Sequence, residues 1–173
     1  WVPPPVGDKQ KWRYALWDND ASWGHYINYT GVPSTGPDAD PCNADNLPDP
    51  GGQGHIPILN QLLLNDEFSQ AYITRYADLI NGPFSCPSMH ALLDSMVAVI
   101  QPEMQRQINT WGGTYADWEA NVQTLRDYID DRCVAMTQGL IDCYNLSGPF
   151  DLTVNVDPPG AGTIKVNSVW APT

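Results

Sequence analysis

The sequence has few cations and no long hydrophobic run. Lys and Arg number 8 against 20 Asp and Glu, which gives a formal net charge of -12 and an isoelectric point near 4.2. A chain this acidic repels polyanions, so we expect no binding to nucleic acid or to anionic lipid. The longest apolar run, at 91–100, is interrupted by Asp94 and Ser95. It falls short of the ~18 apolar residues of a membrane helix, so we expect no membrane span.

Several motifs that build familiar sites are missing. No G-x-S-x-G occurs, which argues against a serine hydrolase. The four cysteines include no C-x2-4-C pair, so their spacing does not suit zinc. An even number of cysteines favours at least one disulfide and an oxidising compartment. Of the three possible pairings we favour Cys42–Cys86 with Cys133–Cys143, although the sequence alone does not decide between them.

The first residues indicate how the chain is produced. It begins Trp1-Val2-Pro3, with no Met and no signal-like segment. We therefore expect a piece of a longer protein, which with the cysteines suggests a secreted or cell-surface location.

The N-terminal third combines a strand with a long loop. Residues 10–17 alternate aromatic and polar side chains and predict a strand. From Trp23 to Gly54 the composition shifts to Gly, Pro, Asn and Asp. Loops this long are commonly functional, so this stretch is a candidate site.

The middle of the chain has helical periodicity. Two short helices should follow Gly54 and meet near Asn65-Asp66. A third should span about 87–100, where Pro102 interrupts the pattern and starts a fourth helix. The longest helix is expected at about 115–137 and should end at Gly139.

The last residues predict a β-hairpin. Residues 151–156 and 163–169 read as strands around a Pro-Pro-Gly-Ala-Gly turn. We expect residues 1–148 to form a helical domain and 149–173 to begin a β-rich surface module. The predicted fold class is mainly α, with an N-terminal strand and a C-terminal hairpin, and α+β overall.

Two carboxylates at the end of the first strand form the strongest candidate site. Asp18 and Asp20 are two residues apart, so in an extended chain both point to one side. An all-oxygen site of this kind suits Mg²⁺, Mn²⁺ or Ca²⁺. The alternative is an ordinary acidic turn, because Asp is a common turn residue.

This segment resembles a known family. Residues 11–20, Lys-Trp-Arg-Tyr-Ala-Leu-Trp-Asp-Asn-Asp, are similar to the W-D-x-D segment of the spore coat protein H (CotH) family, whose fold is an atypical protein-kinase-like one. The resemblance covers about 9–148, with weaker matches at 76–81, 102–104 and 111–113. It implies a helical bundle like a kinase C-lobe in a secreted bacterial surface protein.

The resemblance also assigns roles to residues. Asp18 would match the Asp that holds Mg²⁺ or Mn²⁺ on the phosphates of ATP, with Asn19 and Asp20 as neighbouring ligands or supporting groups. His25 follows closely and could contact a phosphate or the metal, against the alternative of a structural imidazole.

Other parts of a kinase are not identifiable. Lys9 and Lys11 lie too near Asp18 to be the lysine that contacts the nucleotide, and no Gly-rich loop or catalytic base precedes the strand. Those parts should lie in an upstream N-lobe of the same longer protein, so this chain alone should be catalytically incomplete.

Three functions remain open at this stage. The leading one is the metal-binding half of a kinase that phosphorylates Ser or Thr of extracellular proteins. The alternatives are a non-catalytic structural or adhesive surface protein that keeps a divalent cation, and a carbohydrate-binding module with an exposed row of aromatic side chains.

The long loop holds a second candidate metal site. Asp38, Asp40 and Asp45 are spaced as in a calcium loop, but the Gly and terminal Glu of an EF-hand are absent. The site would take Ca²⁺, and the alternative is a solvated loop.

Overall fold

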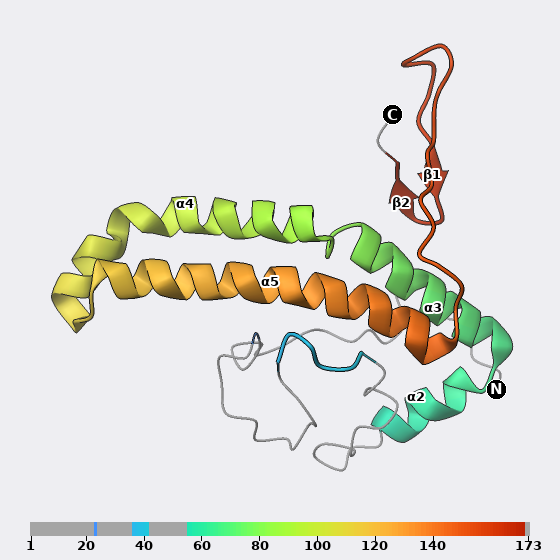
Figure 1. Ribbon diagram of the computed structural model, residues 1–173, viewed down its shortest axis with the longest axis horizontal. Helices are drawn as coiled ribbons and strands as arrows, with labels where there is room; N and C mark the ends of the chain where they lie inside the picture. Colours follow the sequence, from blue (N-terminus) through green and yellow to red (C-terminus); the bar gives the residue numbers. More distant parts are fainter. Residues whose placement is uncertain (1–22, 24–35, 42–54, 172–173) are drawn as a thin grey trace, which may run out of the picture.

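The computed structural model describes residues 23, 36–41 and 55–171 (Figure 1). In this part of the chain, four helices precede a two-stranded antiparallel hairpin. The prediction of a mainly helical α+β chain is therefore confirmed. The predicted strand at 10–17 lies outside the described residues.

The first two helices meet where the sequence predicts. Helix α2 spans His55–Leu63 and helix α3 spans Asp66–Asn81. The side chain of Asn65 caps α3, since its Oδ1 accepts a hydrogen bond of 2.9 Å from the backbone N–H of Phe68. This cap satisfies one N–H at the start of the helix and separates the two helices.

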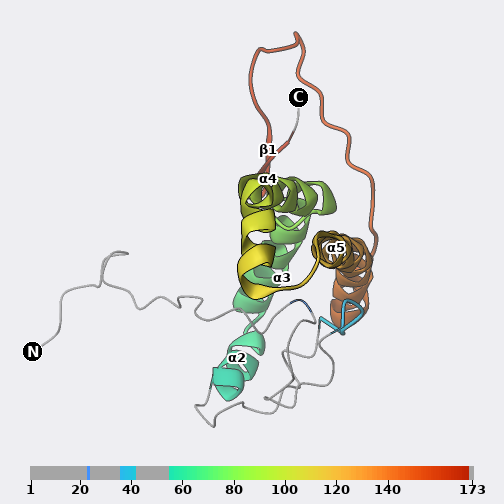
Figure 2. The ribbon, with the colours of Figure 1, turned by 90° about the vertical axis from the view of Figure 1, so that its left-hand side faces the viewer.

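Helix α4 spans Cys86–Trp111 without a break. The predicted division into two helices at Pro102 is wrong, because Pro102 lies inside α4. A proline inside a helix removes one helical hydrogen bond and can bend the helix without ending it. The last third of α4 bends away from the axis of its first part (Figures 1 and 2).

Helix α5 spans Tyr115–Tyr144 and returns antiparallel to α4, which lies beside it in both views (Figures 1 and 2). The Thr114 hydroxyl caps it and accepts a 3.1 Å hydrogen bond from the Asp117 N–H. The predicted end at Gly139 is wrong, since the helix continues to Asn145, a cap with left-handed backbone (φ 49°). Left-handed Asn is a common helix terminator.

Helix α5 carries the centre of the described fold. Its side chains Ile129 and Leu140 are the buried hydrophobic residues among those described. Near its end, the rings of Tyr144 and Tyr72 of α3 meet edge to face, with centroids 6.3 Å apart. The helix therefore packs against α4 along its first part and α3 along its second (Figure 1).

The hairpin is shorter than expected and uses a different turn. Strand β1 (Lys165–Val166) pairs with strand β2 (Val169–Trp170), and Val166 lies opposite Val169. The predicted strand at 151–156 does not form, and the prolines and glycines after it make a separate turn, in which Ala161 N–H donates to Pro158 O. The turn of the hairpin starts at Asn167, whose φ is 51°.

None of the helices described here has the length and hydrophobicity that a transmembrane segment requires.

Candidate functional site

The structure describes two of the seven predicted ligand residues. Asp38 and Asp40 belong to the described segment 36–41, and both are exposed. The other predicted ligands lie outside the described residues: Asp18, Asn19, Asp20, His25 and Asp45.

An arginine holds the segment 36–41 against α5. The Arg132 guanidinium donates a 3.0 Å hydrogen bond to the carbonyl oxygen of Pro37 and a second bond to that of Ala39. These bonds are partly buried, which strengthens them relative to bonds in water. Arg132 thus fixes the backbone on either side of Asp38.

Arg132 is a functional position that the sequence analysis did not identify. The residue is half-buried and reaches across α5 to the loop. One signal in the sequence was available: Arg132 lies between Ile129 and Met136, at the three- and four-residue spacings that define one helix face.

A glycine lets the loop approach α5 closely. A Cβ atom built on Gly139 would lie 2.2 Å from Cγ of Pro41, well inside contact distance. Gly139 therefore serves loop packing and not helix termination. From sequence alone, a glycine late in a helical pattern indicates a possible helix end. Only the folded chain shows that another segment lies against it.

The phenol of Tyr76 lies beside this loop. Its hydroxyl donates to Sδ of Met136 at 3.4 Å. Burial raises the pKa of Tyr76 from its usual value of 10.0 to about 12, and the negative charges of Tyr72 and Asp40 act in the same direction, whereas Arg132 opposes them. Tyr76 is therefore neutral at physiological pH, and its hydroxyl acts as a hydrogen-bond donor and not as a base.

An apolar cavity of about 480 Å³ lies between α3, the start of α4 and α5. This volume is within the range of small-molecule sites. Its walls are mostly hydrocarbon, aromatic and sulfur groups. Arg132 also lines the cavity, but its guanidinium already donates to the carbonyl oxygens of Pro37 and Ala39. The cavity therefore suits an apolar group better than the phosphates of a nucleotide. The residues that line it include Tyr76, Leu79, Phe84, Met89, Ile129 and Met136.

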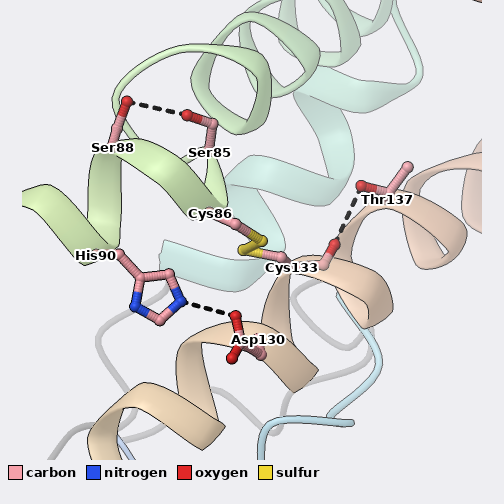
Figure 3. Close-up of a disulfide and its surroundings, with 7 residues drawn as sticks. All are labelled: Ser85, Cys86, Ser88, His90, Asp130, Cys133 and Thr137. Atoms are coloured by element: carbon pink, nitrogen blue, oxygen red, sulfur yellow. Dashed lines mark hydrogen bonds and ion pairs between the residues drawn. A yellow bond between two sulfur atoms is a disulfide. The ribbon is translucent and has the colours of Figure 1, made fainter.

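A disulfide joins the first residue of α4 to the second half of α5 (Figure 3). It links Cys86 with Cys133, whose Cα atoms are 5.9 Å apart. The predicted pairs Cys42–Cys86 and Cys133–Cys143 are therefore wrong. Cys143 is also disulfide-bonded, whereas Cys42 lies outside the described residues.

Two polar contacts between α4 and α5 follow the disulfide along the same pair of helix faces. His90 Nε2 lies 2.7 Å from Asp130 Oδ1, as Figure 3 shows, and Arg126 pairs with Asp94 farther along. The members on α4 are four residues apart, so they occupy one face of the helix. The register of these pairs explains the disulfide, because an antiparallel partner brings Cys133 opposite Cys86.

The described residues include no group of three or more His, Cys, Asp or Glu side chains that could hold a metal ion. Asp38 and Asp40 are brought to one short loop on α5, but no third ligand of these types joins them within the described part. The calcium site with Asp45 stays a prediction. Oxygen-rich side chains in an exposed loop fit hard cations by their chemistry.

Comparison with known protein families identifies a family that covers most of the chain. The family described as CotH kinase protein matches residues 5–136, which is more than half of the chain. No curated protein and no solved structure matches this chain. The matched range includes the Trp-Asp-Asn-Asp segment, helices α2 to α4 and the part of α5 that holds Arg132. The chain belongs to the CotH kinase protein family.

Proposed function

We propose that this chain is the metal-binding, C-lobe half of a secreted bacterial CotH-type kinase. In the intact protein it would transfer the γ-phosphoryl group of ATP to Ser or Thr of extracellular proteins. One observation carries the proposal: the family match extends over residues 5–136 and includes the carboxylate pair of Asp18 and Asp20.

The helical part would provide the base on which that segment rests. Helices α3 and α4 both pack against α5, and Arg132 fixes a loop that follows the carboxylate pair by about twenty residues. Positioning contributes strongly to phosphoryl transfer, because the reaction needs the donor and acceptor in line.

The carboxylates would hold Mg²⁺ or Mn²⁺ through Asp18, with Asp20 and Asn19 as ligands or supporting groups. Such an ion, when bound, neutralises charge on the phosphates of ATP. His25 would contact a phosphate oxygen or support a ligand. Hard, oxygen-rich donors suit these cations.

The remaining groups would come from residues upstream of Trp1. These are a lysine on the nucleotide and a base that orients the acceptor hydroxyl. We therefore place the acceptor site at the junction with that N-lobe, and expect this chain alone to be inactive.

The test uses the intact protein and ATP labelled at the γ-phosphate. We expect label to appear on Ser or Thr of an extracellular protein mixture only with Mg²⁺ or Mn²⁺, and Asp18→Asn to lower the rate at least a hundredfold, because one charged metal ligand is lost. Glu119→Gln, an exposed acid on α5, is the matched control and should leave the rate unchanged.

The outcome also separates the rival function. Equal rates in Asp18→Asn and the unmodified protein would contradict the role of Asp18. Absence of transfer from the intact protein with both cations would favour a structural or adhesive surface protein that keeps the fold.

A further inference from the structure

The C-terminal hairpin contacts α3 through a buried carboxylate. Asp78 lies in the last part of α3 and is only 6% exposed. A buried carboxylate is costly unless hydrogen bonds or a cation compensate its charge. Its partners therefore indicate what this position is built to hold.

Those partners come from the turn of the hairpin, about ninety residues later in the chain. The backbone N–H of Ser168 donates to Oδ2 of Asp78 at 3.0 Å, and the Ser168 hydroxyl donates to the same oxygen. Arg75, one helical turn before Asp78, donates to the Ser168 hydroxyl at 3.2 Å. The turn is thus held by a carboxylate and a guanidinium together.

Packing supports the same contact. A Cβ atom built on Gly82, just after α3, would lie 3.6 Å from Cγ2 of Val169 and 2.9 Å from the carbonyl oxygen of Asp78. The 3.6 Å distance is an ordinary van der Waals separation, so Val169 of β2 lies against the end of α3. The hairpin stands on the α3–α4 junction in Figures 1 and 2.

We propose that Asp78 and Arg75 form a receptor for the Asn167–Ser168 turn and fasten the hairpin to the helical body as a strap. The hairpin lies beyond the matched range of residues 5–136. The strap therefore extends the folded unit past that range and closes residues 145–164 into a loop. This inference does not depend on kinase activity.

Trypsin measures the docked state directly. Lys165 is the one Lys or Arg after Arg132, and it lies in β1. A docked hairpin resists cleavage there, because a protease needs a locally unfolded segment. We expect Asp78→Asn in the full chain to speed cleavage after Lys165 roughly tenfold or more, since hydrogen bonds to a charged group are lost.

Amide exchange provides an independent reading. The Ser168 N–H should exchange slowly in the unmodified protein and roughly tenfold faster in Asp78→Asn. Asp151→Asn changes an exposed acid in the same C-terminal segment and should alter neither rate.

A second variant covers the case in which Asp78→Asn does not fold. Ser168→Ala removes only a hydroxyl from an exposed residue and should speed both processes several-fold. Circular dichroism checks that α3 to α5 are intact. Cleavage and exchange equal to those of the unmodified protein in a folded variant would overturn the strap.

Discussion

At Gly139 the absence of a side chain has a structural role. Pro41 occupies the space that a Cβ atom would need, and Arg132, seven residues earlier, holds the same loop by two hydrogen bonds. The two residues act together, since one makes room for the loop and the other binds its backbone.

Gly139→Ala should therefore destabilise the protein although alanine favours helices. We expect a loss of about 1–3 kcal/mol from overpacking, measured by urea unfolding. Gly162→Ala is the matched control, because a Cβ there meets nothing within 4 Å.

The cause can be isolated with a second change. Pro41→Ala in the Gly139→Ala background should recover part of the loss, and the double-mutant cycle should show coupling between the two positions. Additive effects would mean that Pro41 is not the obstacle.

Asp78 gives the strap a defined pH dependence. Hydrogen bonds from Ser168 hold the pKa of Asp78 below its usual value of 3.8; burial opposes them, and Arg75 and the side chain of Asn167 add to the lowering. A lowered folded-state pKa stabilises the fold above the unfolded-state pKa, and this contribution is lost as the pH falls through the folded value.

We therefore expect docking of the hairpin, read from the exchange rate of the Ser168 N–H relative to the intrinsic rate at each pH, to stay constant from pH 7 to about pH 5 and to weaken below about pH 4, as Asp78 becomes protonated. Asp78→Asn should remove this dependence. A midpoint near pH 6 would indicate a different titrating group.

Among the elements, the helices with local capping signals were the most predictable. Asn65 and Thr114 are caps that bond only to their own sequence neighbours, and the structure confirms the predicted junction of two helices near Asn65. Gly139 misled the prediction because its contact with Pro41 outweighs its intrinsic tendency to end a helix. Pro102 misled it because a proline can lie inside a helix and bend it without ending it. The hairpin forms nearer the C-terminus than predicted, at 165–170, where Ser168 of its turn binds Asp78 of α3.

The disulfide also belongs to this scale. Folding back at Gly112-Gly113 makes α4 and α5 antiparallel, which places Cys86 opposite Cys133. The prediction considered cysteine spacing without that fold-back, and a bridge between cysteines 47 residues apart in sequence does not follow from spacing alone.

Peptide mapping without reduction tests the pairing. Trypsin places Cys86 in residues 76–106 and both Cys133 and Cys143 in 133–165, and a second cleavage before Asp142 separates the latter two. We expect the peptides with Cys86 and Cys133 to remain joined. Release of the 133–165 peptide alone would contradict the structure.

Replacing Cys86 and Cys133 together by Ser should lower the free energy of unfolding by about 2–4 kcal/mol, because the bridge closes a loop of about fifty residues. Urea unfolding measures the loss. Replacing Ser88, an exposed residue of α4, by Ala should change it little and serves as the control.

At the scale of the whole molecule, family and fold class followed from the sequence, whereas the contacts did not. The Trp-Asp-Asn-Asp segment and the helical periodicity are local patterns. The docking of Arg132 on the loop and of Asp78 on the hairpin joins residues about ninety apart, and no local pattern specifies such pairs.

The described helices also leave large hydrophobic side chains exposed. Val99, Trp111 and Val134 are each more than 70% exposed. Single exposed hydrophobic side chains are common on protein surfaces, and they do not by themselves define an interface.

Nucleotide binding tests the central claim most directly. Calorimetric titration of ATP into the intact protein with Mn²⁺ should give saturable binding that chelation abolishes and that Asp18→Asn weakens at least a hundredfold, with Glu119→Gln unchanged. Equal ATP affinity in Asp18→Asn and the unmodified protein would contradict the assignment of Asp18 as the residue that holds the metal.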